Sequence, residues 1–182
     1  DDYVTLGDIL NINNFPITLQ FDFFLPYNLS PGYSITPFRT DHSTSCSIYS
    51  GIWAHISQDA CQISYGDNTG QGAGDRRTKH SISGLNLNLG QWYNFTSIIR
   101  GPQDMDMFID GVNIGGNYSG NGGSIAYTSD PVLFGYSCIN SYPYVYDAFS
   151  LDNFGFWTIE LSNQQIQQYM NCSPTGSESG LV

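Results

Sequence analysis

Polar and apolar residues alternate in short segments of this chain, and turn residues end each segment. Ile17–Leu25 alternates through Asp22, and in Asp104–Ile109 the aspartates stand opposite two methionines and an isoleucine. A period of two is typical of a strand with one buried face. Asp110-Gly111 then supplies the favoured dipeptide of a tight hairpin turn. This pattern limits the chain to β-structure built from antiparallel hairpins.

Three aspartates gather in this second segment, which raises the question of whether they perform chemistry. Asp104 and Asp106 share the polar side of the strand, while Asp110 belongs to the turn. Carboxylates on an open sheet face keep ordinary acidity and make poor acid catalysts. We therefore expect the polar face of a hairpin, without catalysis or a bound cation.

Further segments with strand composition follow one another along the chain, separated by turns rich in glycine and proline. We expect strands over residues 3–9, 51–57, 62–65, 77–82, 92–99, 112–114, 131–136 and 151–159. One helix is expected over 161–170, with Ser162 as its cap and Gln165 as the capping-box partner. These elements predict an all-β fold, an antiparallel two-sheet jelly-roll sandwich with one short C-terminal helix.

The chain shows no internal repeat and no linker, so we expect a single domain over residues 1–172. The tail 173–182 resembles the start of a cleavable tag, and we expect the fold to stop before it. Because the chain opens on Asp1-Asp-Tyr, we also expect that any leader peptide has been removed.

The charge of the chain excludes several classes of partner. Its 182 residues carry a formal net charge of −11, with only five basic residues. Such a chain repels nucleic acid phosphates and anionic lipid surfaces, so neither is an expected partner. No apolar run approaches the ~20 residues that a membrane span needs. The composition suits an extracellular protein that meets neutral ligands or divalent cations.

Four cysteines are present without the C-x-x-C spacing of zinc sites. Three pairings are possible, and we expect the sequential one, Cys46–Cys61 and Cys138–Cys172. Closing the first of these loops would add ~3 kcal/mol by restricting the unfolded chain. The alternative is four buried free thiols. Disulfides would fit an extracellular compartment.

Three segments, in order and at matching spacing, resemble the laminin-G-like branch of the concanavalin A-like lectin/glucanase superfamily. Residues 1–6 (DDYVTL) are similar to the start of that family's first strand. Residues 91–99 (QWYNFTSII) and 105–111 (MDMFIDG) are similar to its tryptophan-tyrosine strand and Y-I-D-G hairpin. Residues 151–157 (LDNFGFW) and 160–166 (ELSNQQI) resemble its closing strand and helix. The resemblance spans nearly all of residues 1–171.

The resemblance implies a sandwich fold and, in many relatives, a structural calcium ion. That ion lies between the start of the first strand and the aspartate of the closing strand, positions that match Asp2 and Asp152 here. The alternative is that Asp152 faces solvent or bonds a backbone N–H. The chain departs from the family pattern at Asn153, where the family has aspartate, and at Gly155, where it has arginine.

Glucanases share this fold, and glycoside hydrolysis needs two carboxyl groups astride the scissile bond. The glucanase branch carries the signature Glu-x-Asp-x-x-Glu, which the two glutamates of this chain, Glu160 and Glu178, cannot form. The histidines His42, His55 and His80 are scattered, and no Gly-x-Ser-x-Gly elbow is present. We therefore expect a protein that is not an enzyme.

The segment 136–149 (YSCINSYPYVYDAF) is the strongest candidate for a ligand site. Flat aromatic rings can cover the apolar face of a sugar, while Asp or Asn bonds its hydroxyl groups. The predicted ligand-binding residues are Asn140, Tyr142, Tyr144, Tyr146 and Asp147, with Trp53 as a further candidate. The alternative is that these tyrosines pack over Cys138 and close the edge of the sandwich. Trp92 and Trp157 lie in motif strands and are expected in the core.

Arg76, Arg77 and Lys79 gather most of the positive charge beside a glycine-rich turn. They could contact an acidic sugar or an acidic protein surface. We expect instead that they form the solvated end of a hairpin.

The sequence thus predicts a non-catalytic extracellular recognition module, a carbohydrate-binding domain of a larger surface protein or adhesin. Its expected partner is a glycan or glycoprotein on a cell surface or matrix. Two alternatives stay open: a protein-binding adhesion module of the same fold, and an accessory domain of a secreted glycoside hydrolase.

Overall fold

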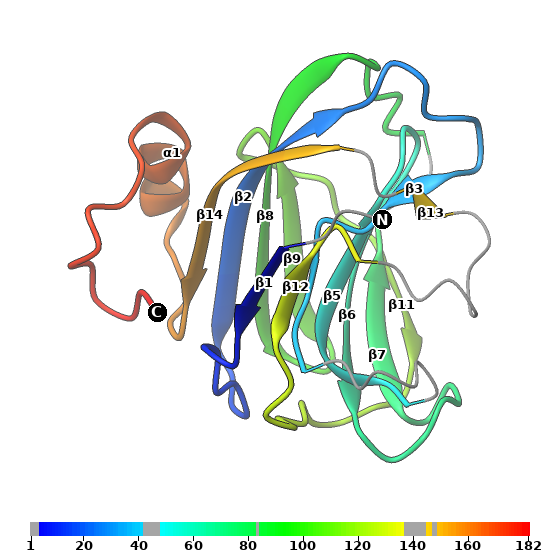
Figure 1. Cartoon of the computed structure of the whole chain (residues 1–182), viewed down its shortest axis with the longest axis vertical. Helices are drawn as coiled ribbons and strands as arrows, with labels where there is room; N and C mark the ends of the chain where they lie inside the picture. Colours follow the sequence, from blue (N-terminus) through cyan, green and yellow to red (C-terminus); the bar gives the residue numbers. More distant parts are fainter. Residues whose placement is uncertain (1–3, 42–47, 83, 137–144, 147–148) are drawn as a thin grey trace.

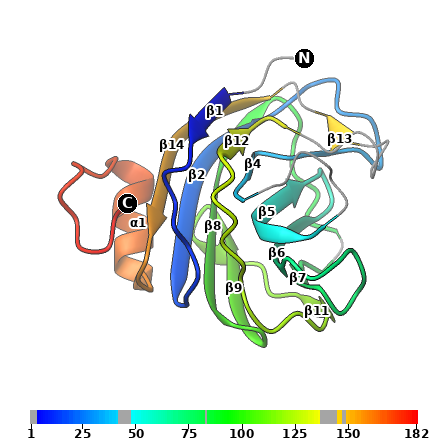
Figure 2. The ribbon, with the colours of Figure 1, turned by 60° about the horizontal axis from the view of Figure 1, so that its bottom comes forward.

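Figure 1 shows the computed structural model of the chain, which describes residues 4–41, 48–82, 84–136, 145–146 and 149–182. Two β-sheets face each other, and a single helix lies outside them, as Figure 2 also shows. The predicted all-β sandwich with one short C-terminal helix is therefore confirmed.

The smaller sheet has five strands in the order β10-β9-β8-β2-β14, and all neighbours are antiparallel. Its strands are β2 (Ile17–Leu25), β8 (Gln91–Gly101), β9 (Asp104–Ile109), β10 (Val112–Asn113) and β14 (Ser150–Trp157). The Asp110-Gly111 turn joins β9 to β10, so the predicted hairpin is confirmed. Asp110 lies at φ +49, in the left-handed region that such a turn requires.

The larger sheet has nine strands, seven of which form the path β1-β12-β4-β5-β6-β7-β11. They are β1 (Val4–Gly7), β4 (Phe38–Arg39), β5 (Ser50–Ile56), β6 (Cys61–Asp67), β7 (Arg76–His80), β11 (Asn117–Gly120) and β12 (Val132–Phe134). Two further short strands, β3 (Ser34–Ile35) and β13 (Val145–Tyr146), pair in parallel with each other, and β3 also pairs with β5.

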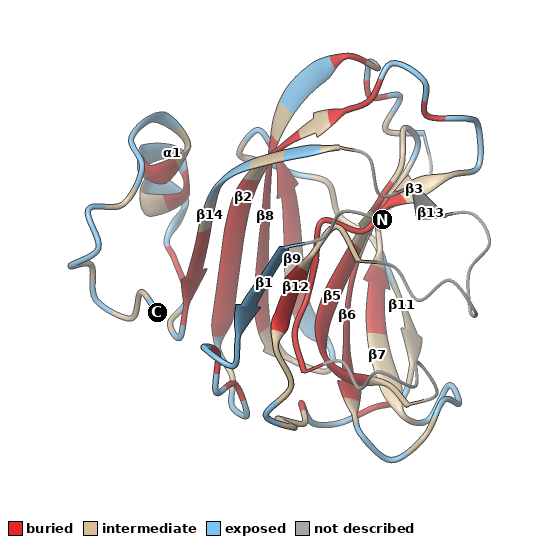
Figure 3. Ribbon diagram, viewed as in Figure 1, coloured by how far each residue is buried: buried red, intermediate tan, exposed pale blue. Residues whose placement is uncertain are grey.

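The core lies between the two sheets, whose central strands are buried along most of their length (Figure 3), and every second residue of these strands contributes to it. Phe21 and Phe23 of β2 meet Phe95 of β8, and Ile52 and Tyr65 face them from the larger sheet. All five side chains are buried. Because residues of opposite parity point outward, the sequence alternation fixes which side chains can form a surface site.

The helix α1 (Asn163–Asn171) covers one end of the outer face of the five-stranded sheet. Ser162 caps it, and Gln165 completes the capping box, as predicted. Trp157 of β14 stacks on Tyr169 of α1 with ring centroids 5.3 Å apart and an interplanar angle of 16°. Ile98 and Phe108 complete a second apolar cluster under the helix. The predicted burial of Trp157 is confirmed.

The chain beyond the helix returns to the sandwich. The backbone N–H of Thr158 donates to the carbonyl of Gly180, and that of Val182 donates to the carbonyl of Phe156. Leu181 packs against the apolar cluster under the helix. Residues 173–182, which we expected to lie outside the fold, thus extend the structure at β14.

Two basic side chains of β7 face inward, so the expectation that this group is solvated is wrong for them. Lys79 is buried and donates to the carbonyl of Met105. Arg77 donates to the carbonyls of Pro102 and Gly120. Both cations lie over the ring of Tyr118, at 5.4 and 4.8 Å. The physical reason is parity, because odd-numbered residues of β7 point toward the core side, where backbone carbonyls satisfy their charge.

Cys61 is a free, buried thiol at the start of β6, and burial raises its pKa to about 12. Its predicted partner Cys46 lies outside the described residues. The Cys46–Cys61 pairing therefore stays a prediction.

Cys172 is a free, exposed thiol at the end of α1. Its predicted partner Cys138 lies outside the described residues, so this pairing also stays a prediction. In the part of the chain that the structure describes, no helix is long and apolar enough to cross a membrane.

Candidate functional site

Most of the predicted ligand-binding loop cannot be placed. Asn140, Tyr142, Tyr144 and Asp147 lie outside the described residues, as does Asp2 of the predicted calcium site. Tyr146 belongs to β13, where its backbone pairs with Ile35 of β3. The binding role of this loop therefore stays a prediction.

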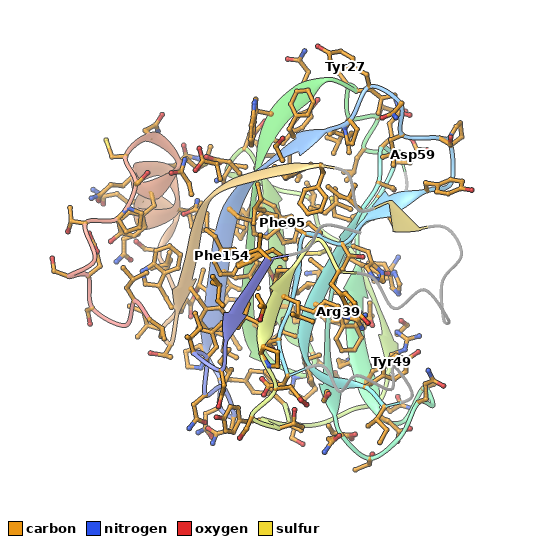
Figure 4. The ribbon with its side chains drawn as sticks, viewed as in Figure 1. Tyr27, Arg39, Tyr49, Asp59, Phe95 and Phe154 are labelled. Atoms are coloured by element: carbon orange, nitrogen blue, oxygen red, sulfur yellow. The ribbon has the colours of Figure 1, made fainter. Side chains whose placement is uncertain are left out.

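Trp53 lies on β5 and points away from the core, but its side chain is packed. Only 4% of it is exposed. The ring of Tyr49 stacks on it at 5.4 Å and 19°, and the guanidinium of Arg39 lies 5.8 Å from its centroid. Figure 4 labels Arg39 and Tyr49 in this part of the larger sheet. Among the described contacts Trp53 is a packing residue, and its ring is not open to a sugar.

Trp92, which we expected in the core, is exposed instead. It stands on the outer face of β8, and 51% of its surface is accessible. Its cross-strand partner is Phe24 of β2, with ring centroids 5.7 Å apart. Phe24 also contacts Tyr27 edge to face at 5.8 Å, and Tyr27 is 75% exposed. We call Phe24, Tyr27 and Trp92 the aromatic platform.

The helix leaves this platform uncovered because it reaches only part of the outer face. Gln20 of β2 donates its amide to the carbonyl of Ile166, and the last turn of the helix reaches Gly111, where Gln167 and Met170 lie close to the β9–β10 turn. Phe24 lies four residues further along β2, or about 13 Å. Figure 3 shows the start of β8 as exposed, and Figure 4 shows Tyr27 at the same end of the molecule, far from α1.

Gly90, in the loop before β8, leaves room for the ring of Tyr27 on this platform. Gly90 adopts φ +74, and its N–H donates to the carbonyl of Leu25. A Cβ atom at this position would lie 1.9 Å from the Tyr27 ring. Only glycine tolerates both the left-handed backbone and the close ring. The packing of Tyr27 against the loop before β8 therefore depends on Gly90.

A polar row crosses the sheet directly beside the aromatic platform. Asp22 of β2 is paired with Asn94 of β8 on one side and with Asp152 of β14 on the other. The side-chain amides of Asn94 and Asn153 donate to the two oxygens of Asp22, at 2.8 and 2.6 Å. Asp110 accepts from the backbone N–H of Asn94 at 2.8 Å. The polar row of Asp22, Asn94 and Asp152 thus places fixed hydrogen-bond acceptors next to the exposed aromatic rings.

A bulge in β14 shapes one end of this polar row. The pairing with β2 slips between Asp152 and Gly155, and Asn153 adopts φ +51. Asn153 accepts from the hydroxyl of Ser173 at 2.6 Å while its amide reaches Asp22. Asparagine is one of the few non-glycine residues that adopt the left-handed region readily, so this residue suits the bulge.

The predicted calcium ligand Asp152 is exposed on this row, and one of its oxygens accepts from the backbone N–H of Asn153. Both oxygens of its neighbour Asp22 accept from amides as well. Within the described ranges no three acidic, histidine or cysteine side chains are grouped as a metal site would require. Asp2 lies outside the described residues, so the calcium site predicted at Asp2 and Asp152 stays a prediction.

Burial raises the pKa of the Asp41 carboxyl to about 6 from an ordinary 3.8. Asp41 is 1% exposed and lies at φ +48. One oxygen accepts from the backbone N–H of Thr128 at 2.8 Å, and the other has no hydrogen-bond partner among the described residues. The charges of Asp8 and Asp130 raise its pKa further. Asp41 anchors one loop to another and is sealed from solvent, which does not suit a catalytic acid.

The two described histidines are likewise bonded within the larger sheet. Nδ1 of His55 lies 2.6 Å from the amide of Gln62, and burial lowers the pKa of His55 to about 3. Nε2 of His80 lies 2.8 Å from the hydroxyl of Ser119, and burial lowers its pKa too. Both therefore favour the neutral form.

An Asp41→Asn variant should unfold at higher temperature than wild type at pH 7.5 and at nearly the same temperature at pH 4. The raised pKa means that folded Asp41 binds a proton more tightly than the unfolded residue, so its stabilising effect is lost as pH rises through about 6. Two pKa units correspond to about 3 kcal/mol at neutral pH. Asn keeps the acceptor for Thr128 and tolerates positive φ.

Thermal denaturation across this pH range checks the prediction, with the exposed Asp59→Asn as the matched control. Parallel curves for Asp41→Asn and wild type would show that Asp41 does not titrate in this range.

Comparison with known proteins identifies the superfamily to which the fold belongs. A family model of the concanavalin A-like lectin/glucanases superfamily matches residues 1–167. No curated protein sequence matches the chain. Similar solved structures share little sequence with it, and the chain spans less than half the length of the first of them.

A Bacteroides ovatus protein described as carbohydrate binding aligns with 98% of this chain and 47% of its own, at 14% identity and TM-score 0.66. The ligand-binding domain of botulinum neurotoxin serotype D, solved with N-acetylneuraminic acid, aligns with 93% and 40%, at 12% identity and TM-score 0.62. Domain 4 of AbnA, an extracellular arabinanase of Geobacillus stearothermophilus, was solved with arabinotriose. It aligns with 91% and 71%, at 11% identity and TM-score 0.58. At such identities the likeness shows the fold alone.

Proposed function

Because this chain belongs to the concanavalin A-like lectin/glucanase superfamily, we propose that it is a carbohydrate-binding module. The observation that carries the proposal is the aromatic platform, where Trp92 and Tyr27 present open rings on a sheet face. Structural neighbours that were solved with arabinotriose and with N-acetylneuraminic acid support a glycan ligand.

The platform and the polar row together supply what sugar binding requires. An aromatic ring covers the apolar C–H face of a pyranose or furanose ring and excludes water from it. Carboxylate oxygens accept hydrogen bonds from hydroxyl groups, and Asp152 and Ser150 stand exposed beside Phe24 and Asp22. The sheet fixes the rings and these acceptors in one geometry before a ligand arrives, which lowers the entropy cost of binding.

We further propose that the module is non-catalytic. Glu160 bonds Arg100 at 2.8 Å, and Glu178 accepts from the backbone of its own turn at Thr175. Asp41 is buried in a contact between two loops, and both oxygens of Asp22 accept hydrogen bonds from asparagine amides, so these carboxyls have structural partners that do not suit acid and base roles. Absence of hydrolysis on any polysaccharide that the protein binds is the expected result.

The place of the module in the cell is also part of the proposal. We propose an extracellular domain of a larger surface protein or adhesin that meets a glycan or glycoprotein on a cell surface or matrix. An accessory domain of a secreted glycoside hydrolase is the other setting that fits, since one neighbour is such a domain of an arabinanase.

A glycan-array screen of the purified protein, run with calcium and with EDTA, tests the function. Binding to a defined glycan class supports it, and comparison of Trp92→Ala with Tyr144→Ala then separates the platform from the predicted tyrosine loop. Failure of the folded protein to bind any glycan would contradict it. In that case a protein ligand becomes the better account, with the exposed apolar edge at Val4 and Leu6 of β1 as its first candidate surface.

Glycan binding at the platform should be insensitive to EDTA. The described residues around it offer hydrogen bonds, and no three-ligand metal group lies among them. Titration of one array hit before and after EDTA treatment measures this. Loss of binding that calcium alone restores would instead point to the proposed Asp2 and Asp152 site.

A further inference from the structure

We infer that the aromatic platform accepts saccharides without anionic groups, neutral or amino sugars, and excludes sialylated or uronic acid glycans. This inference rests on the proposed function and adds the ligand class. The observation behind this inference is that every basic side chain of the protein lies away from the platform.

Among the described residues, the charged groups next to the platform are carboxylates. Asp22 and Asp152 stand in the row next to Phe24, and Asp110 lies one strand further across the sheet. The two amides that bond Asp22 hold its carboxylate in place, so it cannot turn away from a ligand. Because carboxylates accept hydrogen bonds and donate none, these groups pair with hydroxyl or ammonium donors and repel a ligand carboxylate.

All five basic residues of the sequence are described, and four of them belong to the larger sheet. Arg39 lies over Trp53, and Arg76 lies over Tyr49. Arg77 and Lys79 bond the carbonyls of Pro102 and Met105, where β8 turns into β9. That turn is the opposite end of β8 from Trp92, and Arg39 and Arg76 lie over the stacked rings of Trp53 and Tyr49 on the larger sheet, so none of these cations lies at the platform.

Arg100 is the only basic residue on the smaller sheet, and it too is far from the platform. Eight residues of β8 separate it from Trp92, a distance of about 26 Å. It is held by Asp104, Asp106 and Glu160, each within 2.9 Å. The Debye length at physiological ionic strength is about 8 Å, so this charge is screened at the platform. An anionic sugar there would meet carboxylates with no counter-charge.

The test uses pairs of identical glycans with and without terminal sialic acid on one array, and polygalacturonan before and after methyl esterification. The uncharged member of each bound pair should bind at least about tenfold more tightly at low salt, and the difference should shrink at 0.5 M NaCl. The double variant Asp22→Asn, Asp152→Asn should bring the ratio of uncharged to charged affinity closer to one, whatever loss of affinity both members share. Circular dichroism shows whether the double variant is folded, and Asp152→Asn alone provides a milder change.

The outcomes separate the ligand class from the proposed function. Equal binding of charged and uncharged members, lost in both when Trp92 is replaced, would overturn the charge inference and leave the module a carbohydrate binder. Tighter binding of the sialylated members would overturn it as well. No binding of any glycan by the folded protein would remove the proposed function, and the inference would fall with it.

Discussion

Replacing Trp92 by alanine should raise the Kd for a bound glycan by about 30-fold and leave the melting temperature nearly unchanged. Exposed aromatic anchors at the centre of a binding site are each worth about 2 kcal/mol or more, which corresponds to that change in affinity. The ring is half exposed, so its loss removes little buried surface from the folded state. Isothermal titration calorimetry with one array hit, together with a thermal melt, measures both effects.

Two further variants make the result specific to the ring. Trp92→Phe keeps a flat aromatic surface and should retain much of the affinity. Val112→Ala removes an apolar side chain that is 67% exposed at the other edge of the same sheet and should change nothing. Unaltered affinity in Trp92→Ala would exclude the aromatic platform as the binding site and leave the tyrosine loop as the remaining candidate.

Trp157→Ala should reduce the free energy of unfolding by about 3–5 kcal/mol, the cost of removing a large buried side chain. This indole is 1% exposed and stacks on Tyr169, so it joins the helix to the outer face of β14. The cluster around it has few other members, and the helix would lose its main contact. Chemical denaturation monitored by circular dichroism measures the loss.

Trp157→Phe is the matched control for this variant. The indole N–H has no hydrogen-bond partner in the described structure, so phenylalanine removes an unsatisfied donor while it keeps an aromatic ring. We expect it to cost less than half as much as the alanine variant. Equal destabilisation by both would mean that a partner of the indole N–H is important to the fold.

The regular part of the fold could be predicted because alternation and turn chemistry act locally. β2 has the predicted bounds Ile17–Leu25, and the Asp-Gly turn and the capping box form where the sequence expects them. Strands of two residues, such as β3 and β4, could not be predicted, because two residues show no period. They form only because they can pair with the edge of a longer neighbouring strand.

The candidate site was missed for a reason that the sequence itself contains. Trp92 shares its parity with Asn94 and Thr96, while Tyr93 and Phe95 have the parity of the core. Reading Trp92 by its motif placed it in the core, whereas reading it by its parity places it outside. The coverage of that face could not be predicted, since it depends on where α1 docks, more than 60 residues later.

The buried position of Asp41 is a second feature that could not be predicted from the sequence. Its hydrogen-bond partner Thr128 is 87 residues away, and nothing local marks the loop that approaches it. Burial between these distant segments raises its pKa, and the hydrogen bond from Thr128 only partly opposes that rise. Properties that arise from long-range packing of irregular segments leave no periodic trace in the chain.

The open ring of Tyr27 has a consequence for how the protein is produced. Asn28-Leu29-Ser30, directly beside it, is an N-glycosylation acceptor sequence on the exposed end of the sheet. A glycan attached there by a eukaryotic host would be tethered next to the aromatic platform at an effective concentration in the millimolar range. By contrast, the amide of Asn94 in Asn94-Phe95-Thr96 is buried and bonded to Asp22, so the folded chain protects it from the transferase. In protein from a glycosylating host, the glycan attached at Asn28 would thus compete with added ligand for the platform. In protein from a bacterial host it would not.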